Sequence, residues 1–102
     1  MNPDLRILKL EDFQELIDQD FAVSYEEGGE PQTVFTLRKV ESNGQGRDGF
    51  RDPFSLFFDG PPDLPLPQHI YWLTHEKLGT EMIFLVPISG NADQRVYQAA
   101  FN

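Results

Sequence analysis

Residues 70–88 read Ile-Tyr-Trp-Leu-Thr-His-Glu-Lys-Leu-Gly-Thr-Glu-Met-Ile-Phe-Leu-Val-Pro-Ile, and this stretch decides the fold. In its first part, bulky side chains occupy both sets of alternating positions, with Tyr71, Leu73 and His75 on one face and Ile70, Trp72 and Thr74 on the other. Residues 77–80 have the composition of a turn, and residues 82–88 are nearly all apolar, as expected of a strand covered on both faces. The stretch therefore predicts a β-hairpin at the centre of the fold.

Other segments show the alternation of half-buried strands. Apolar residues recur at every second position in residues 21–25 and again in residues 33–41, with a Gly- and Pro-containing turn between them, so these segments predict a second hairpin. Residues 54–58 and 96–101 predict further strands. Short strands joined by turns, with no helices between them, indicate a mainly β protein, namely a six-stranded antiparallel barrel or a two-sheet sandwich.

One short helix is predicted before the strands. Leu10, Phe13, Leu16 and Ile17 lie on one helical face, which favours an amphipathic helix over residues 10–18. The acidic residues 11 and 12 fall near its first turn, where the helix dipole favours negative charge, so we expect them to be structural. With no repeat or linker visible, we expect a single domain over residues 1–102, with a β-core from 21 to 102.

Two segments are predicted to be loops. Residues 42–53 combine Gly, Ser, Asn and Asp, which favours an exposed loop, and its Arg47 and Arg51 could contact an acidic surface. Residues 59–67 contain four prolines, so this segment must be extended and cannot join the centre of a sheet. We interpret it as a crossing loop, with a proline-rich ligand for an SH3-like groove as the alternative.

The chain is strongly acidic. Its 102 residues include 17 Asp and Glu against 8 Lys and Arg, which gives a formal net charge of −9. Such a charge repels a phosphate backbone, so nucleic acid is not expected as a partner. Residues 1–30 alone carry nine acids and two bases. This acidic part is interpreted as a solvated surface, with electrostatic docking on a basic partner as the alternative.

Missing residues and motifs exclude several kinds of chemistry. The sequence contains no Cys, which excludes disulfides, cysteine-ligated zinc or iron–sulfur sites, and thiol catalysis. It has no nucleophile elbow, phosphate-binding glycine loop, zinc-protease motif or calcium loop, so we expect no cofactor and no metal. No apolar run approaches the roughly 18 residues of a membrane span. We expect no membrane association, and a protein that is cytoplasmic or part of a virion-like assembly.

The two histidines do not predict a metal site. His69 and His75 lie in one predicted strand at opposite ends, about 20 Å apart, which is too far to bind one metal. We expect His75 to be a hydrogen-bonded structural residue and His69 to lie at the edge of a loop. Pairs of acids such as Asp59 with Asp63, or Glu76 with Glu81, are too common in this sequence to indicate catalysis.

Exposed apolar residues are the best candidates for a functional surface. If the helix does not cover them, Phe57, Ile70 and Trp72 would form an interaction patch, whereas a covered core is the alternative. With the proline-rich loop added, the candidate interface comprises Phe57, Pro62, Leu64, Pro65, Ile70 and Trp72. A barrel that binds a small ligand, or a hydrolase, is the second hypothesis, with a candidate pocket at Tyr71 and His75.

Several motifs together resemble a known family. They are Arg51-Asp-Pro-Phe-Ser-Leu-Phe-Phe-Asp-Gly-Pro61, Leu66-Pro-Gln68, Tyr71 with Leu73 and His75, Leu78-Gly79, Ile83-Phe-Leu-Val-Pro-Ile88 and Tyr97-Gln-Ala-Ala-Phe-Asn102. This combination resembles a small uncharacterised bacterial domain family of about this length whose members end in Phe-Asn. The likeness covers residues 51–102 and includes a Leu-Glu-Asp-Phe opening at residues 10–13.

The resemblance implies a biological context but no active residue. Members of that family are often encoded beside phage-type tail-collar fibre proteins, which implies a role in making or decorating a fibre or virion. We therefore expect a non-enzymatic structural or accessory protein of a phage-like tail, fibre or virion assembly. It would act through contacts with a protein partner such as a tail or fibre component, and a homo-oligomer is a further option.

Overall fold

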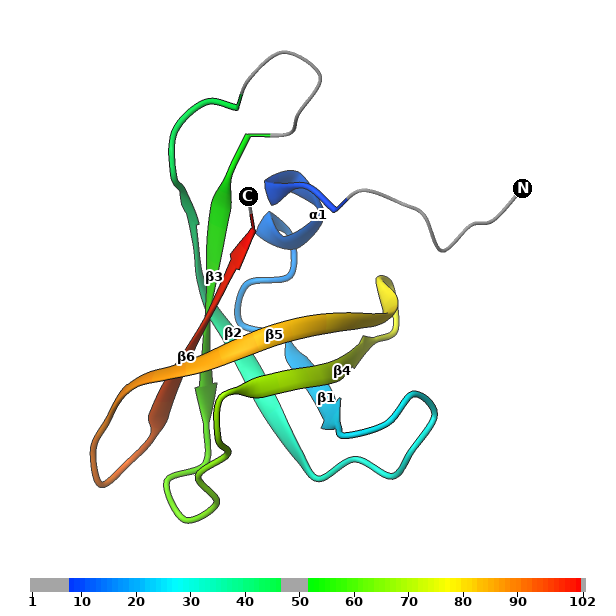
Figure 1. Cartoon of the computed structure of the whole chain (residues 1–102), viewed down its shortest axis with the longest axis vertical. Coiled ribbons are helices and arrows are strands. Elements are labelled where there is room, and N and C mark those ends of the chain that lie inside the picture. The colour runs from blue at the N-terminus through cyan, green and yellow to red at the C-terminus, as the bar shows by residue number, and fades with distance from the viewer. Residues whose placement is uncertain (1–7, 47–51, 102) are drawn as a thin grey trace.

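The computed structural model describes residues 8–46 and 52–101, which contain one helix and six strands (Figure 1). In chain order these are α1 (Leu10–Gln14), β1 (Asp20–Ser24), β2 (Thr33–Ser42), β3 (Phe54–Gly60), β4 (His69–His75), β5 (Gly79–Gly90) and β6 (Arg95–Phe101). The strands overlap the segments predicted from alternation and from the apolar run at residues 82–88, so the mainly β interpretation is confirmed.

The strands form a closed barrel in the order β1-β2-β3-β6-β5-β4, and every neighbouring pair is antiparallel. Of the two architectures expected, the barrel is therefore the one observed. The predicted hairpins β1–β2 and β4–β5 are both present. Because β6 lies between β3 and β5, the chain must pass from β3 to β4 across one end of the barrel. The proline-rich segment makes this crossing, as predicted.

Large aromatic side chains fill the interior. Inward-facing residues of neighbouring strands lie opposite one another, as in the pairs Phe21↔Phe35 and Phe58↔Tyr97, and all four side chains are fully buried. The rings of Phe35 and Tyr97 are stacked with centroids 4.5 Å apart, and Phe21 meets Phe58 edge-on at 5.4 Å. Such ring pairs add attraction beyond the burial of their area. The core is therefore the barrel lumen itself.

Helix α1 closes the end of the barrel opposite the proline-rich segment (Figure 1). Its Phe13 is fully buried and packs against Phe54 at 5.9 Å and Phe101 at 5.8 Å, at the start of β3 and the end of β6. The Lys9 backbone N–H donates to the Asp12 carboxylate at 2.8 Å, so Asp12 has the structural role expected of it. In the described part of the chain, no helix is long and apolar enough to cross a membrane.

The helix is shorter than the predicted range of residues 10–18, because it ends at Gln14. Residues 15–18 form a turn in which Asp18 has a positive φ of 73°, a conformation that cannot continue a right-handed helix. The Asp18 N–H donates to the Leu37 carbonyl, and the Leu37 N–H donates to the Gln19 carbonyl, so hydrogen bonds to β2 replace helical ones. Leu16 remains buried within this turn, which satisfies the apolar pattern without a helix.

The backbone passes very close to the stacked rings at Gly60. A Cβ atom placed on Gly60 would lie 2.5 Å from a ring carbon of Phe35 and 3.0 Å from one of Tyr97. Both rings are fully buried, so neither has space to move aside. Only glycine fits at this position without displacing the core.

We expect Gly60→Ala to lower the free energy of unfolding by about 1 to 3 kcal/mol, the usual cost of overpacking a core. Urea denaturation followed by circular dichroism measures this change. Ser89→Ala, at an exposed position of β5, is the control and should leave the midpoint nearly unchanged. Equal midpoints for the two variants would contradict the close contact at Gly60.

Candidate functional site

An apolar face lies on the outside of the β4–β5 hairpin. The register opposes Ile70 to Phe84 and Trp72 to Met82, and these positions alternate with the buried inward residues of the same strands. Met82 is 57% exposed, Phe84 48% and Ile70 45%, whereas Trp72 is partly buried. We call these four residues the β4–β5 face.

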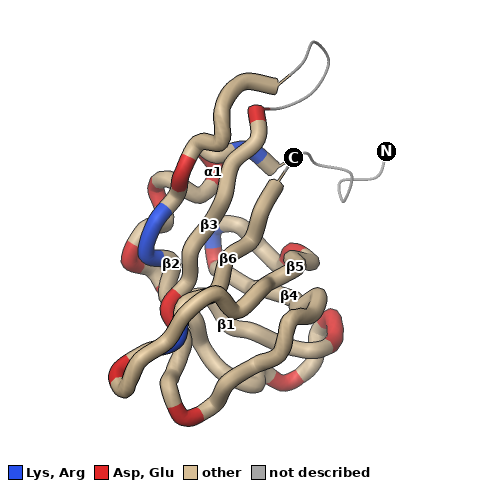
Figure 2. The backbone as a smooth tube through the Cα atoms, turned by 60° about the vertical axis from the view of Figure 1, so that its left-hand side comes forward, with Lys and Arg blue, Asp and Glu red and all other residues tan. Residues whose placement is uncertain are grey.

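The outer wall remains uncharged across the neighbouring strands, although the polar Gln98 interrupts its apolar side chains. Val86 on β5 is opposite Gln98 on β6, and Gln98 is opposite Phe57 on β3. Ile88, at the bulge in β5, adds another side chain that is 47% exposed. The outward positions of β4, β5 and β6 in this region carry no charged residue, and these strands are drawn mainly tan in Figure 2.

The expectation that residues 82–88 are covered on both faces is wrong. The outer side chains of β5 are exposed because the barrel has a single wall, and α1 closes its end rather than lying over β5. For this reason, the candidate interface predicted from the sequence does not include Met82 and Phe84. The predicted turn at residues 77–80 is enough to place these two residues on the outer face. A hairpin with this turn puts Phe84 opposite Ile70 and Met82 opposite Trp72.

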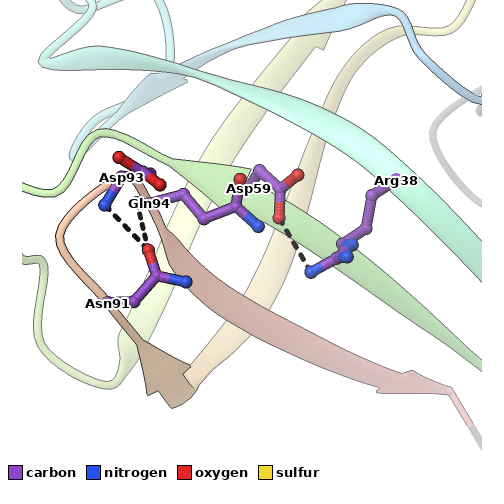
Figure 3. A network of polar contacts seen from close by, with 5 residues as sticks. All are labelled: Arg38, Asp59, Asn91, Asp93 and Gln94. Carbon is purple, nitrogen blue, oxygen red and sulfur yellow. Dashed lines mark hydrogen bonds and ion pairs between the residues drawn. The ribbon is translucent and has the colours of Figure 1, made fainter.

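Further round the barrel, the part of the wall formed by β2 and β3 carries charged side chains. On β2 and β3, an Arg38 guanidinium nitrogen lies 3.2 Å from an Asp59 carboxylate oxygen (Figure 3). Lys39 lies 2.9 Å from Glu41, and its ammonium group is 5.3 Å from the centre of the Phe57 ring. This cation partly covers Phe57, which sets it apart from the more exposed β4–β5 face.

Hydrogen bonds hold the turn between β5 and β6 in one conformation, near the ion pair of Arg38 and Asp59. The Asn91 side-chain oxygen accepts hydrogen bonds from the backbone N–H groups of Asp93 at 2.7 Å and Gln94 at 3.0 Å (Figure 3). The Asn91 N–H in turn donates to the Gln94 carbonyl at 2.8 Å. These bonds fix the end of the β5–β6 hairpin and therefore the direction in which β5 runs from it.

The proline-rich loop is held at the barrel end by three hydrogen bonds. The buried Leu66 N–H donates to the Tyr97 hydroxyl at 2.9 Å, and the Tyr71 hydroxyl donates to the Pro67 carbonyl at 2.5 Å. The Arg95 side chain donates to the Pro62 carbonyl at 3.2 Å. Leu66 is buried and covers the core at this end.

The structure brings only part of the predicted interface together. Ile70 and Trp72 share the β4–β5 face, and Phe57 lies on the same outer wall across β6. Pro62, Leu64 and Pro65 lie instead in the loop at the end of the barrel, where Leu64 and Pro65 are exposed and Pro62 is partly buried. The face on the wall is therefore the larger continuous apolar candidate.

The alternative pocket residues do not converge. Tyr71 and His75 both face inward on β4, but Leu73 lies between them, which separates their Cα atoms by about 13 Å. The Tyr71 hydroxyl is bound to the Pro67 carbonyl at one end of the barrel. His75 packs against Phe21, with ring centres 5.0 Å apart. The two side chains therefore belong to different parts of the core.

Both nitrogens of His75 are engaged in structural hydrogen bonds. The Lys77 N–H donates to Nδ1 at 3.0 Å, so Nδ1 must be the unprotonated nitrogen. Nε2 then carries the proton and donates to the Gln19 side-chain oxygen at 2.6 Å. These bonds join the β4–β5 turn to the segment before β1. His75 is therefore hydrogen-bonded through both ring nitrogens, as expected.

His69 is exposed at the start of β4 and lies against two tyrosines. Its ring centre is 6.1 Å from that of Tyr25 and 5.4 Å from that of Tyr71. Within residues 8–46 and 52–101, no group of three or more His, Asp or Glu side chains is arranged to hold a metal ion. Arg47 and Arg51 lie outside the described residues.

An open depression of about 520 Å³ lies over the seam between β1 and β4. Its lining includes the acids Asp18, Asp20 and Glu76 and the polar residues Gln19, Thr74 and His75, with Ala22 and Val34 beside them. Several of these groups already have partners, since Asp20 accepts from the Thr36 hydroxyl and the Thr74 hydroxyl is bonded to that of Thr80. The depression offers carboxylates at a surface, without a free histidine beside them.

Residues 8–101 match one family model. The chain belongs to the family described as "Domain of unknown function (DUF6916)". No curated protein and no solved structure matches the chain. The match confirms that the chain belongs to an uncharacterised domain family. It covers residues 8–101, and so includes most of the first half of the chain in addition to residues 51–101.

The hydrogen bond from Leu66 to Tyr97 can be tested by removing one hydroxyl. We expect Tyr97→Phe to lower the free energy of unfolding by about 1 to 3 kcal/mol, because the Leu66 N–H would remain buried without a partner. Ser89→Ala removes a hydroxyl from an exposed position of β5 and should cost about 0.5 kcal/mol or less. Chemical denaturation compares the two variants, and equal losses would argue against a buried tether at Tyr97.

Tyr71 makes stability depend on pH in the alkaline range. Burial, followed by the neighbouring Tyr25 and Tyr97 phenols, raises the pKa of Tyr71 from 10.0 to about 12. Below pH 10 the phenol is protonated in both the folded and unfolded states, and its contribution is fully present. Between pH 10 and 12 the unfolded chain loses this proton first, so the free energy of unfolding falls as pH rises.

We expect the Tyr71→Phe variant to lose less of its unfolding free energy than the wild type between pH 10 and 12. The measurement is the difference in unfolding free energy between wild type and variant at a series of pH values from 8 to 12. The difference should shrink above pH 10, because only the wild type loses the contribution of the Tyr71 proton. A difference that stays constant over the whole range would show that Tyr71 titrates normally.

Proposed function

We propose that this domain is a non-enzymatic structural or accessory protein that acts through protein–protein contacts in a phage-like tail, fibre or virion assembly. The observation that carries the proposal is the β4–β5 face, where Ile70, Met82 and Phe84 are each about half exposed side by side. Isolated exposed apolar residues are common on proteins, but a continuous group of this kind marks interaction surfaces.

The energetics of the face favour association. Complete burial of a large apolar side chain contributes roughly 1.5 to 3 kcal/mol, so covering the exposed halves of Ile70, Met82 and Phe84 would contribute about 1 kcal/mol each. Trp72 adds an aromatic side chain, a residue type enriched at the energetic centres of interfaces. The face lies on a hydrogen-bonded hairpin, so little backbone conformational entropy is lost when a partner binds.

The barrel interior supports a contact function over ligand binding. A small-ligand barrel needs an enclosed cavity of several hundred Å³ lined by a few convergent polar groups. Here fully buried Phe, Tyr and Leu side chains occupy the lumen, and the hydroxyls of Tyr71 and Tyr97 are engaged with the proline-rich loop. Both ends are covered, by α1 and by that loop.

The tail or fibre context is supported by the family resemblance. Genes for members of the family that this sequence resembles often lie beside those for tail-collar fibre proteins, which makes a fibre or tail component the first partner to test. The β4–β5 face consists of side chains that project from a hydrogen-bonded hairpin, so we expect side chains to make the contacts with such a partner.

We expect the double variant Met82→Lys/Phe84→Lys to lose its native partner. The experiment purifies tagged wild type and variant from the natural host and compares the amount of each tail or fibre component recovered, using quantitative mass spectrometry. Two buried charges at the centre of an interface should reduce recovery at least tenfold. Val34→Lys, at a position on β2 that is 48% exposed, is the matched control and should retain the partner.

Circular dichroism and thermal denaturation establish that each variant is folded before recovery is compared. Specific recovery of a tail or fibre component that depends on positions 82 and 84 supports the proposal. Recovery that is identical for wild type and the double variant would remove the β4–β5 face from the function. Turnover of a small substrate by the wild type would overturn the non-enzymatic assignment.

A further inference from the structure

We infer that the partner of the β4–β5 face is a protein surface with an apolar centre and Lys or Arg side chains on one flank. This inference rests on the proposed contact function and adds the chemistry of the partner. It is drawn from an acidic loop beside the face, residues 25–32, which connects β1 to β2. We call this segment the acidic loop.

The acidic loop is fixed next to the β4–β5 face. Ser24, the last residue of β1, is opposite Trp72 of the face. The following residue, Tyr25, packs its ring against those of His69 and Tyr71, at 6.1 and 5.4 Å, so the start of the loop lies against β4. A partner that covers Trp72 therefore comes close to the start of the acidic loop.

Hydrogen bonds hold the loop in one shape. The Gly29 N–H donates to the Glu26 carbonyl at 3.0 Å, and the Ser24 hydroxyl donates to the Gly29 carbonyl at 3.3 Å. The Gln32 N–H donates to the Val23 carbonyl at 2.7 Å, where the loop rejoins the sheet. The acids of the loop are thus presented on a defined turn.

The loop carries three acids, Glu26, Glu27 and Glu30, and no base. All three are exposed, and no described base forms an ion pair with them. Two bases on β2 are already paired elsewhere, Arg38 with Asp59 and Lys39 with Glu41. Figure 2 shows acidic segments mainly in turns and loops at the ends of strands. The negative field beside the face is therefore not neutralised locally.

A cleft in this loop has room for a cationic side chain. It measures about 300 Å³ and is lined by Tyr25, Glu26, Gly29, Glu30 and Gln32. It combines one aromatic ring with two carboxylates, which are the groups that attract ammonium and guanidinium ions. A Lys or Arg on the partner could enter the cleft while apolar residues cover Ile70 and Phe84.

Charge disfavours a second copy of this chain as the occupant. Each copy carries a formal net charge of −9, so self-association would bring two strongly negative molecules together. The β4–β5 face has no cation to offset this repulsion. A basic flank on a different protein gives attraction instead, and it would also accelerate association at low salt.

Trp72 makes the inference measurable, because it is the only tryptophan in the chain and it lies in the face. The probes are two synthetic amphipathic peptides without Trp, which share the same Leu positions and carry Lys in one peptide and Glu in the other. We expect the Lys peptide to shift the Trp72 emission to shorter wavelength in a saturable titration. The Glu peptide should bind at least tenfold more weakly.

Salt and charge variants identify the acidic loop as the source of this preference. Raising NaCl from 0.05 to 0.5 M should weaken binding of the Lys peptide at least tenfold, because exposed charges are then screened. Glu26→Gln/Glu30→Gln should weaken it several-fold and reduce the salt dependence. Glu11→Gln/Glu15→Gln removes the same net charge from exposed positions near α1 and is the matched control, with binding expected to stay within twofold of wild type.

The outcomes separate this inference from the proposed function. Equal binding of the two peptides, abolished by Met82→Lys/Phe84→Lys, would keep the contact function and overturn the basic partner. Equal effects of the two Glu→Gln pairs would overturn the role of the acidic loop. A wild-type dimer in sedimentation equilibrium that Phe84→Lys dissociates would assign the face to a second copy. Failure of both peptides to change Trp72 emission would overturn the inference, whereas only the partner purification decides the function.

Discussion

The aromatic packing inside the closed barrel is the constraint on which the rest of the structure depends. Phe21, Phe35, Phe58 and Tyr97 meet across the lumen, and their contact requires each strand to keep one register. That register sends every alternate side chain to the outside. The exposed positions of Ile70 and Phe84 are therefore a consequence of how the interior is filled, because a slip by one residue would exchange the two sets.

Local sequence patterns were sufficient for the strands but not for their arrangement. Alternation or, for residues 82–88, a nearly continuous apolar run identified all six strands. The pairing of β3 with β6 could not be read from the sequence, because it joins residues as far apart as Phe54 and Phe101. The end of α1 was also misjudged. The apolar spacing of Leu16 is compatible with a helix, but bonds between Asp18, Gln19 and Leu37 stop it earlier.

The candidate surface was predictable in part for the same reason. Ile70 and Trp72 were assigned to an outward face from the parity of β4 alone, and the register confirms that they share it. Met82 and Phe84 looked like buried residues, because an apolar strand carries no information on whether a second layer covers it. The link between the proline-rich loop and the core, through Tyr71 and Tyr97, depends on hydroxyl contacts across distant segments and has no signature in either segment.

The position of β6 also shapes how the molecule can assemble from its chain. This strand completes the circle between β3 and β5, so the five earlier strands leave a sheet with two open edges until it is inserted. Tyr97 on β6 anchors Leu66, so the proline-rich crossing also lacks its tether until then. Non-local pairing of this kind slows folding. A newly made chain would therefore pass through an open five-stranded sheet with two unpaired edges before the barrel closes. Chaperones would bind the chain during this period.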